Sequence, residues 1–141
     1  MNSLLGLNIR ERFGLTYNIY SFYSPYVDSG IWGIYYACEA GNRERIRRLV
    51  QKELYNLIHK PLGQIRLSRA KKQLTGQLIL GAESLLGQML GQGKDLLDFD
   101  HLIPFSEYLE AIEAITALDL QDAAAEVFAP EHQTILTYRA G

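Results

Sequence analysis

Three histidines, His59, His101 and His132, are the side chains of this sequence best suited to bind a metal or to carry a proton near neutral pH. No two of them lie three or four residues apart, so one helix cannot direct two imidazoles to one ion, as an H-x-x-E-H or H-E-x-x-H motif does. The only local group of oxygen and nitrogen ligands is Asp98, Asp100 and His101, which a polar helix end or loop explains better than a metal site. We therefore expect no metal centre in this chain.

The other reactive side chains also indicate structure rather than catalysis. Cys38 is the single cysteine and lies in an apolar stretch, which favours a small buried hydrophobe over a nucleophile. The "GQGK" at residues 91–94 has no Ser or Thr after the lysine and does not follow a strand, so a phosphate-binding loop is not expected. Carboxylates are spread along the predicted helices, and no pair is forced together by spacing alone. The sequence by itself predicts no catalytic group.

Composition limits the class of partner. The 141 residues are 48% hydrophobic, which suits one domain with a core, and 14 Lys plus Arg against 16 Asp plus Glu give a net charge of -2. The arginine-rich "NRERIRRLV" (residues 42–50) contains an apolar stripe, so we interpret it as a solvated helix face. We expect neither nucleic acid nor a membrane as a partner.

No targeting or membrane segment is recognised in the sequence. The N-terminus lacks a basic leader followed by a long apolar core, and no stretch approaches the length that spans a bilayer. We expect a soluble chain that is not exported, cytoplasmic by default, with the compartment of any parent protein unknown.

Residues 10–25, "RERFGLTYNIYSFYSP", predict a change from helix to strand. A short helix over residues 3–13, capped by Ser3 or Asn2, should end at Gly14, since glycine tolerates the left-handed conformation and lets Leu15 fold back on Ile9 or Arg10. From residue 17 the pattern has period two, and "SPYVDSG" supplies a turn before a second apolar run over residues 31–38. These runs predict an antiparallel hairpin that is apolar on both faces.

Two long helices should follow the hairpin. Asn42 is the expected cap of the first, which should end before Pro61. The second should begin near Arg66 and run through residue 90. Glycine weakens a helix by about 1 kcal/mol relative to alanine, so its three glycines indicate a closely approaching neighbour or a bend near "GQGKD" (residues 91–95).

The last third of the chain predicts two more helices and a strand. Pro104 suits the first turn of one helix, and Thr116 with Asp119 suits the cap of the next, which should stop by Pro130. "QTILTYR" (residues 133–139) should close the chain as a strand. This order predicts an α+β fold in a single domain over residues 1–141.

Four segments, in order, resemble motifs of the insulinase and pitrilysin family of zinc peptidases, which includes the mitochondrial processing peptidases. Residues 7–21, "LNIRERFGLTYNIYS", are similar to the family pattern L-x-x-x-[LI]-R-E-x-x-G-L-[AT]-Y-x-[VI]. The other three are "DSGIWGIYYACEAGNRERIRRLVQKELYNL", "LSRAKKQLTGQLILGAESLLGQML" and "YLEAIEAITALDLQDAAAEVF". Together they cover nearly the whole chain.

The resemblance implies a particular half of a peptidase. Family members consist of paired homologous α+β domains around a chamber, and an inverted H-x-x-E-H motif with a distant glutamate holds zinc in the first domain only. Because this chain lacks that motif, it resembles the later part of the second, non-catalytic type. The implied fold is an antiparallel sheet with helices packed on one face, a half-domain like that of the mitochondrial processing peptidase.

Two residues of this chain match substrate-holding positions of that second domain. By this resemblance, Arg10 would bond a peptide carbonyl, and Tyr17 would polarise the scissile carbonyl or steady an oxyanion. A guanidinium offers five donors and a phenol one directional donor, which suits both for carbonyl oxygens. Tyr20, Phe22 and Tyr23 are candidates for lining the chamber, although core packing explains them equally well. No catalytic residue and no metal ligand are assigned.

The resemblance therefore predicts a substrate-binding, zinc-free C-terminal portion of a metalloendopeptidase. It would act on a peptide or an unfolded protein only with a zinc-bearing partner, and alone it should bind no stoichiometric zinc and show no peptidase activity. The expected partner is a complementary zinc-bearing domain or a second copy. The alternative is a non-enzymatic scaffold subunit of the same fold. The family's opening strands have no counterpart before Met1, so the chain would be a piece of a larger peptidase or an independent short relative.

Overall fold

The computed structural model describes residues 5–138, which form two compact units. Unit 1 comprises the described parts of Met1–Pro25, Gly30–Pro61 and Gln121–Gly141, and unit 2 comprises Tyr26–Ser29 and Leu62–Leu120. The prediction of a single domain over residues 1–141 stays a prediction.

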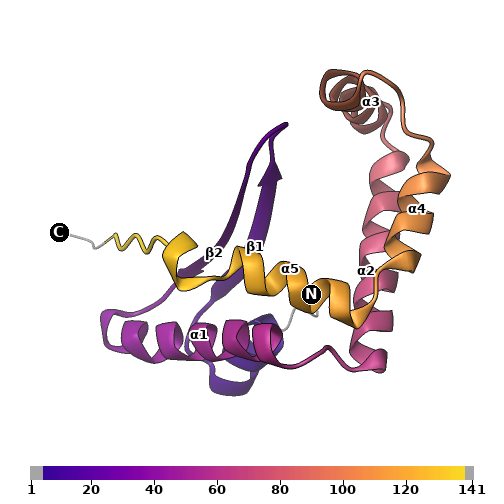
Figure 1. The fold of residues 1–141 in the computed structure, drawn as a ribbon. Helices are drawn as coiled ribbons and strands as arrows, with labels where there is room; N and C mark the ends of the chain where they lie inside the picture. Colours follow the sequence, from indigo (N-terminus) through magenta and orange to yellow (C-terminus); the bar gives the residue numbers. More distant parts are fainter. Residues whose placement is uncertain (1–4, 139–141) are drawn as a thin grey trace. The chain divides into compact units, whose positions relative to one another are not determined.

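Unit 1 is built on the predicted antiparallel hairpin of β1 (Asn18–Pro25) and β2 (Gly30–Ala37) (Figure 1). Ile19 lies opposite Tyr36 in the register, and Tyr20 lies opposite Tyr35. Because successive side chains of a strand point to opposite faces, the first pair belongs to one face of the hairpin and the second pair to the other. The aromatic residues are thereby divided between the two faces.

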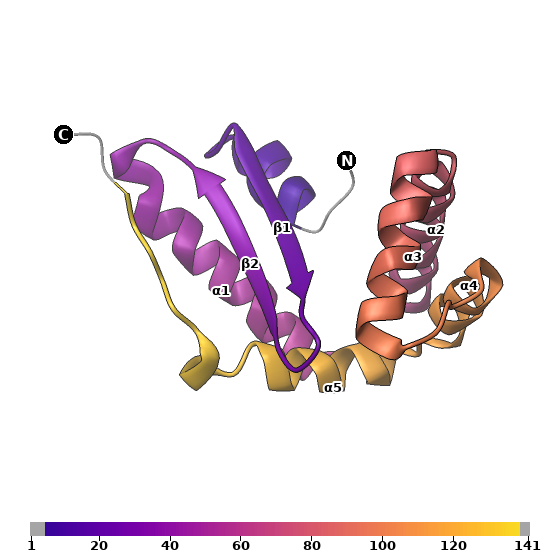
Figure 2. The same ribbon diagram turned by 90° about the horizontal axis from the view of Figure 1, so that it is seen from above.

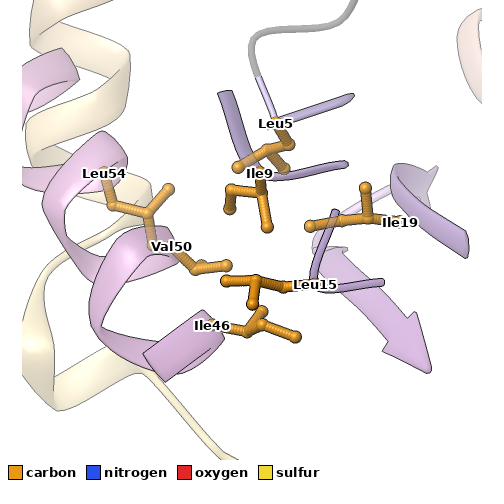
Figure 3. Packing of buried hydrophobic residues seen from close by; sticks show 7 residues of the cluster. All are labelled: Leu5, Ile9, Leu15, Ile19, Ile46, Val50 and Leu54. Atoms are coloured by element: carbon orange, nitrogen blue, oxygen red, sulfur yellow. The ribbon is translucent and has the colours of Figure 1, made fainter. Parts of the chain in front are cut away.

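One helix covers one face of this hairpin. After the short 3-10 turn η2 (Ala40–Asn42), α1 (Arg43–His59) runs along the two strands (Figure 2). Asn42 occupies the predicted N-cap position, although its side chain makes no capping hydrogen bond, and the helix ends before Pro61 as expected. The observed α+β arrangement, an antiparallel sheet with a helix packed on one face, confirms the predicted fold class. Figure 3 shows the buried cluster between them: Leu5, Ile9, Leu15, Ile19, Ile46, Val50 and Leu54.

The described part of the N-terminal helix is a π-helix, η1 (Gly6–Glu11), followed by two further helical residues. The proposed caps Ser3 and Asn2 lie outside the described residues. Ile9 is 0% exposed, and burying such a side chain contributes about 1.5–3 kcal/mol. This burial attaches a short helix to the rest of unit 1.

Helix α5 (Ala117–Val127) begins at the predicted cap, where Asp119 N–H donates to Thr116 Oγ1 (3.2 Å) and Thr116 N–H donates to Asp119 Oδ2 (2.8 Å). The backbone N–H and hydroxyl of Thr116 lower the pKa of the Asp119 carboxyl. Within unit 1, the Gln121 amide donates to the Ile58 carbonyl (2.9 Å) and the Phe128 ring packs 4.4 Å from that of Trp32. The part of α5 that belongs to unit 1 is thus fixed both to α1 and to the hairpin.

The predicted final strand is wrong for the residues that are described. After the 3-10 turn η3 (Pro130–His132), residues 133–138 pair with neither β1 nor β2 and are exposed, while Arg139 lies outside the described residues. Alternating apolar residues suit a strand, but a strand forms only where an edge accepts its hydrogen bonds. Residues 133–138 do not use the outer edge of β1 or of β2, and both edges stay unpaired within the described residues.

Unit 2 contains α2 (Gln64–Ala82), α3 (Leu85–Phe99) and α4 (Phe105–Ala114). The prediction of one helix through residue 90 is wrong, because the chain breaks at residues 83–84 and Ser84 caps a new helix by accepting from Gly87 N–H (3.2 Å). A Cβ at Gly87 would lie 2.9 Å from the Gly81 carbonyl oxygen, so glycine permits this close approach. The close approach at Gly87 agrees with the first of the two alternatives for these glycines, and α3 runs without a break through residues 91–95 to Phe99. Within residues 5–138, no helix has the length and apolarity to cross a bilayer.

A buried carboxylate connects α3 to α4. Asp95 is 7% exposed, accepts from the Tyr108 hydroxyl and accepts from Ile103 N–H (3.4 Å). The hydrogen bond to Asp95 first, and burial second, raise the pKa of Tyr108 from 10.0 to about 12. The folded state thus favours the neutral phenol.

We predict that Tyr108→Phe lowers the free energy of unfolding by about 1 kcal/mol, because Asp95 loses one of its two donors. The folded pKa lies above the ordinary value, so the hydrogen bond contributes fully below pH 10 and its contribution is lost as the pH rises toward 12. Urea denaturation at pH 7, 10 and 11 measures both effects. Tyr26→Phe, at an exposed tyrosine of the same unit, is the control and should change nothing. Equal stability of Tyr108→Phe and wild type at pH 7 would contradict the prediction.

Candidate functional site

Arg10 and Tyr17 lie on either side of a sharp reversal from η1 to β1. The π-helix ends with Arg12 N–H donating to the Leu7 carbonyl, five residues back. Gly14 then adopts φ +59°, and its N–H donates to the Arg10 carbonyl at 3.0 Å. The predicted left-handed glycine and helix-to-strand reversal are therefore confirmed.

Each of the two candidate residues directly follows a buried one. Ile9 precedes Arg10, and Thr16, which is 4% exposed, precedes Tyr17. The Thr16 hydroxyl lies 2.6 Å from the Ala37 carbonyl oxygen and 2.8 Å from that of Asn18, so it donates to the base of the hairpin. Leu15 belongs to the same cluster as Ile9, as the sequence predicted (Figure 3). The backbone at both positions is thereby held from inside.

The two side chains project into solvent. Tyr17 is 92% exposed, and its hydroxyl makes no hydrogen bond within residues 5–138. Arg10 is about one-third exposed and its guanidinium contacts the adjacent Glu11 at 3.3 Å, an exposed ion pair of small energetic value. The two candidates make no hydrogen bond to each other in that part of the chain. Their donors are thus accessible to a ligand.

Two further arginines at the reversal were not predicted as site residues. The guanidinium carbons of Arg12 and of Arg45 each lie 5.5 Å from the centre of the Phe13 ring, the distance of a cation-π contact. Arg12 is next to Phe13 in the sequence, whereas Arg45 comes from α1 and reaches the ring only through the fold. The reversal therefore carries positive charge beyond that of Arg10, which suits the oxygen atoms of peptide carbonyls and carboxylates.

The proposed chamber-lining residues lie on two faces of the hairpin. Tyr20 and Phe22 are on the face away from α1, about half-exposed, with ring centres 6.4 Å apart, and Tyr20 also packs against Tyr35 at 5.2 Å. The Phe22 ring lies across Gly33, where an added Cβ would be 2.4 Å from it. Tyr23 is on the opposite face, across from Trp32. Because the Tyr20 and Phe22 rings are about half-exposed, core packing within the described residues does not explain why these positions are aromatic.

The residue types that bind zinc are not gathered here. His101 Nδ1 lies 2.8 Å from the Phe99 carbonyl oxygen, His132 Nδ1 lies 3.0 Å from that of Glu126, and His59 packs edge-on against Tyr55. Across residues 5–138, no three His, Cys, Asp or Glu side chains are grouped so that they could hold a metal ion. The donor set of this part of the chain does not fit zinc.

Cys38 and Tyr36 support the hairpin from the core side. Both are half-buried and pack against the hydrophobic cluster, in agreement with the interpretation of Cys38 as a small hydrophobe. Burial, and next the nearby Cys38 thiol, raise the pKa of Tyr36 above its usual value of 10.0. The Tyr36 phenol is therefore neutral at physiological pH.

Comparison with known proteins supplies a family and two kinds of relative. The family described as the peptidase M16 inactive domain matches residues 1–74. The chain is 28% identical to an uncharacterized zinc protease of Bacillus subtilis over 100% of its own length and 34% of that protein. It is 29% identical to the alpha subunit of the mitochondrial-processing peptidase of Neurospora crassa, over 90% of this chain and 23% of that one. The chain thus spans between about a quarter and a third of these relatives.

A solved structure shares the fold. A chain of Complex III2 from Candida albicans, solved with Inz-5 bound, superposes with a TM-score of 0.79 at 19% identity, covering 89% of this chain and 30% of that one. This likeness extends over most of the present sequence and bears on the fold alone.

We predict that Gly14→Ala destabilises unit 1 by about 1–2 kcal/mol, since alanine resists a positive φ. No heavy atom lies within 4 Å of a Cβ built at Gly14, so the cost is conformational rather than steric. Gly14→Asn should cost less, because asparagine tolerates the left-handed region. Thermal unfolding measures the series, with Gly41→Ala as a control at an equally open glycine without positive φ. Gly14→Ala and Gly41→Ala with the same midpoint would show that the reversal does not require glycine.

Proposed function

This chain belongs to the family of the peptidase M16 inactive domain, and from that premise we propose that it binds an extended peptide for a zinc centre carried by another domain or chain. Arg10 and Tyr17 are the side chains that contact the peptide in this proposal. The substrate is a peptide or an unfolded protein, because only an extended backbone presents carbonyl groups in succession.

One observation carries the proposal: an exposed phenol and a partly exposed guanidinium emerge from a reversal that is fixed by buried neighbours. Ile9 and Thr16 hold the backbone beneath Arg10 and Tyr17, while the Tyr17 side chain is exposed and that of Arg10 is about one-third exposed. Because the backbone at both positions is already fixed, binding has to order only the rotamers of the two side chains, at about 0.5–1.5 kcal/mol each. Arg12 and Arg45 add positive charge beside them.

Each donor has a distinct role in this proposal. The Arg10 guanidinium donates to a carbonyl oxygen of the substrate backbone and sets the register of the peptide. The Tyr17 hydroxyl donates to the carbonyl oxygen nearest the scissile bond, where negative charge develops during hydrolysis. Zinc, when bound in the partner, supplies an activated water. The present chain contributes orientation and hydrogen bonds.

The need for a partner follows from the donor set and from the lengths of the relatives. No group of side chains in residues 5–138 fits zinc, whereas the Bacillus subtilis relative is named a zinc protease and is about three times as long as its match. The Neurospora crassa relative is named as a subunit. A zinc-bearing domain of the same or another chain is the complement that this arrangement suggests.

A second candidate function is that of a non-enzymatic scaffold. The same fold occurs in a structure described as Complex III2, with no peptidase named, so the fold by itself is compatible with this alternative. The two candidates differ in what Arg10 and Tyr17 do. A scaffold has no use for their donors, so their removal would leave assembly intact.

We predict that Arg10→Ala and Tyr17→Phe each lower kcat/KM for peptide cleavage by about tenfold to a hundredfold in a reconstituted complex with a chain that carries the H-x-x-E-H motif. Each substitution removes hydrogen-bond donors from the substrate without opening the core, so the unfolding midpoint should hardly move. Cleavage should stop on addition of a chelator, and the present chain alone should cleave nothing.

Matched controls distinguish an effect at the candidate site from the general effect of removing an exposed arginine or tyrosine hydroxyl. Arg69→Ala removes an exposed arginine of unit 2, and Tyr138→Phe alters a tyrosine that is 90% exposed, close to the value at Tyr17. Both should retain full activity. Fluorescence anisotropy with a labelled extended peptide gives a second readout, in which only the Arg10 and Tyr17 variants should bind more weakly. Wild-type cleavage and binding by both site variants would reject the substrate role and leave the scaffold function.

A further inference from the structure

Helix α3 is apolar on its outside and acidic on its inside. Its only buried residue is Asp95, while its large apolar residues are 50–85% exposed. At 100° per residue, six of these residues fall within an arc of about 140°, with Gly93 near the middle, Asp95 on the opposite side and Phe99 just outside the arc. We call this surface the α3 stripe: Leu85, Leu86, Met89, Leu90, Leu96 and Leu97.

The α3 stripe is large enough to be the apolar part of an interface. Its exposed fractions amount to about four whole side chains, or roughly 400 Å² at about 100 Å² for each fully buried side chain. A standard interface buries about 800 Å² on each partner, and a little over half of that is apolar. Scattered exposed leucines are ordinary on a protein surface, whereas a contiguous patch of this area is comparable to the largest patch on a typical monomer, which often has a function.

Charge favours a protein partner over a lipid surface. Helices that lie on membranes carry lysine and arginine along their polar face. The charged residues of α3 are Lys94, Asp95 and Asp98, and Lys94 is already paired with Asp98. The helix therefore has no basic face for anionic lipid.

We propose that the α3 stripe is the contact between two copies of this chain, with the two α3 helices packed antiparallel. The stripe contains one gap, at Gly93, where a Cβ would meet no atom within 4 Å. A two-fold axis near residues 91–92 places Leu90 of each copy opposite Gly93 of the other, so that each gap receives a leucine. The same axis places Leu86 opposite Leu97.

A parallel pairing fills the stripe less well. It would place Gly93 opposite Gly93 and leave a void in the centre, which forfeits contacts that a closely packed interface makes. It would also align the two helix dipoles side by side in the same direction, whereas antiparallel dipoles attract. Packing and electrostatics thus favour the same orientation.

Sedimentation velocity of the full chain from 1 to 100 µM tests the association. We expect a dimer at the higher concentrations, and Leu90→Glu or Leu97→Glu should raise the dissociation constant at least tenfold without changing the circular dichroism spectrum. Leu118→Glu, at an exposed leucine of α5, is the matched control and should leave the dimer unchanged. A monomer at all concentrations, or a dimer unaffected by Leu90→Glu, would overturn the proposal.

Disulfide trapping tests the orientation in a Cys38→Ser background, which removes the only native thiol. A chain carrying Leu86→Cys mixed with one carrying Leu97→Cys should give a cross-linked pair of unlike chains. Each variant alone should cross-link poorly. Efficient trapping of like chains would instead establish parallel packing. If the chain floats with neutral phosphatidylcholine vesicles and Leu90→Glu abolishes this flotation, the α3 stripe binds lipid. Trapping of like chains and flotation that depends on Leu90 would each refute the proposed contact.

Discussion

The organisation of unit 1 depends on burial of the short N-terminal helix against α1 and the hairpin. Ile9 from η1 and Ile46 from α1 are both 0% exposed, and Leu15 and Ile19 join them in one cluster (Figure 3). This burial stabilises a six-residue π-helix that has little stability of its own. Because η1 and β1 both pack on this core, the chain has to reverse between them, and Gly14 makes the reversal in the left-handed conformation. The core therefore determines where Arg10 and Tyr17 emerge. The candidate site is a consequence of packing beneath it.

Unit 2 shows the opposite use of polarity. In α3 an aspartate is buried and the leucines are exposed. The hydrogen bond from Tyr108 to Asp95 connects α3 to α4, where α3 buries no apolar side chain. A buried carboxylate requires donors, and here a phenol and a backbone N–H provide them. The surplus apolar surface of α3 is then explained by association rather than by the interior of the unit.

Features specified by local chemistry were predictable from the sequence. The left-handed Gly14, the hairpin of residues 18–37 and the Thr116–Asp119 cap each depend on residues close together in the chain, and all three were confirmed. The break at Ser84 was missed because the leucine spacing continues through it, while a hydrogen bond from Gly87 decides the local geometry. The strand over residues 133–138 did not form because pairing with a hairpin edge is decided by the fold, and the local alternation of residues does not report it. The contact between Arg45 and Phe13 could not be predicted, because only the fold brings these two distant residues together.

Photo-crosslinking can show whether peptide contacts the reversal between η1 and β1. An extended peptide with a benzophenone beside its scissile bond is bound to the reconstituted complex, with chelator present to prevent cleavage. We expect peptide adducts, mapped by mass spectrometry, to fall on residues 10–17 and to be competed by unlabelled peptide. Competable adducts confined to unit 2, or to the zinc-bearing partner alone, would contradict this expectation.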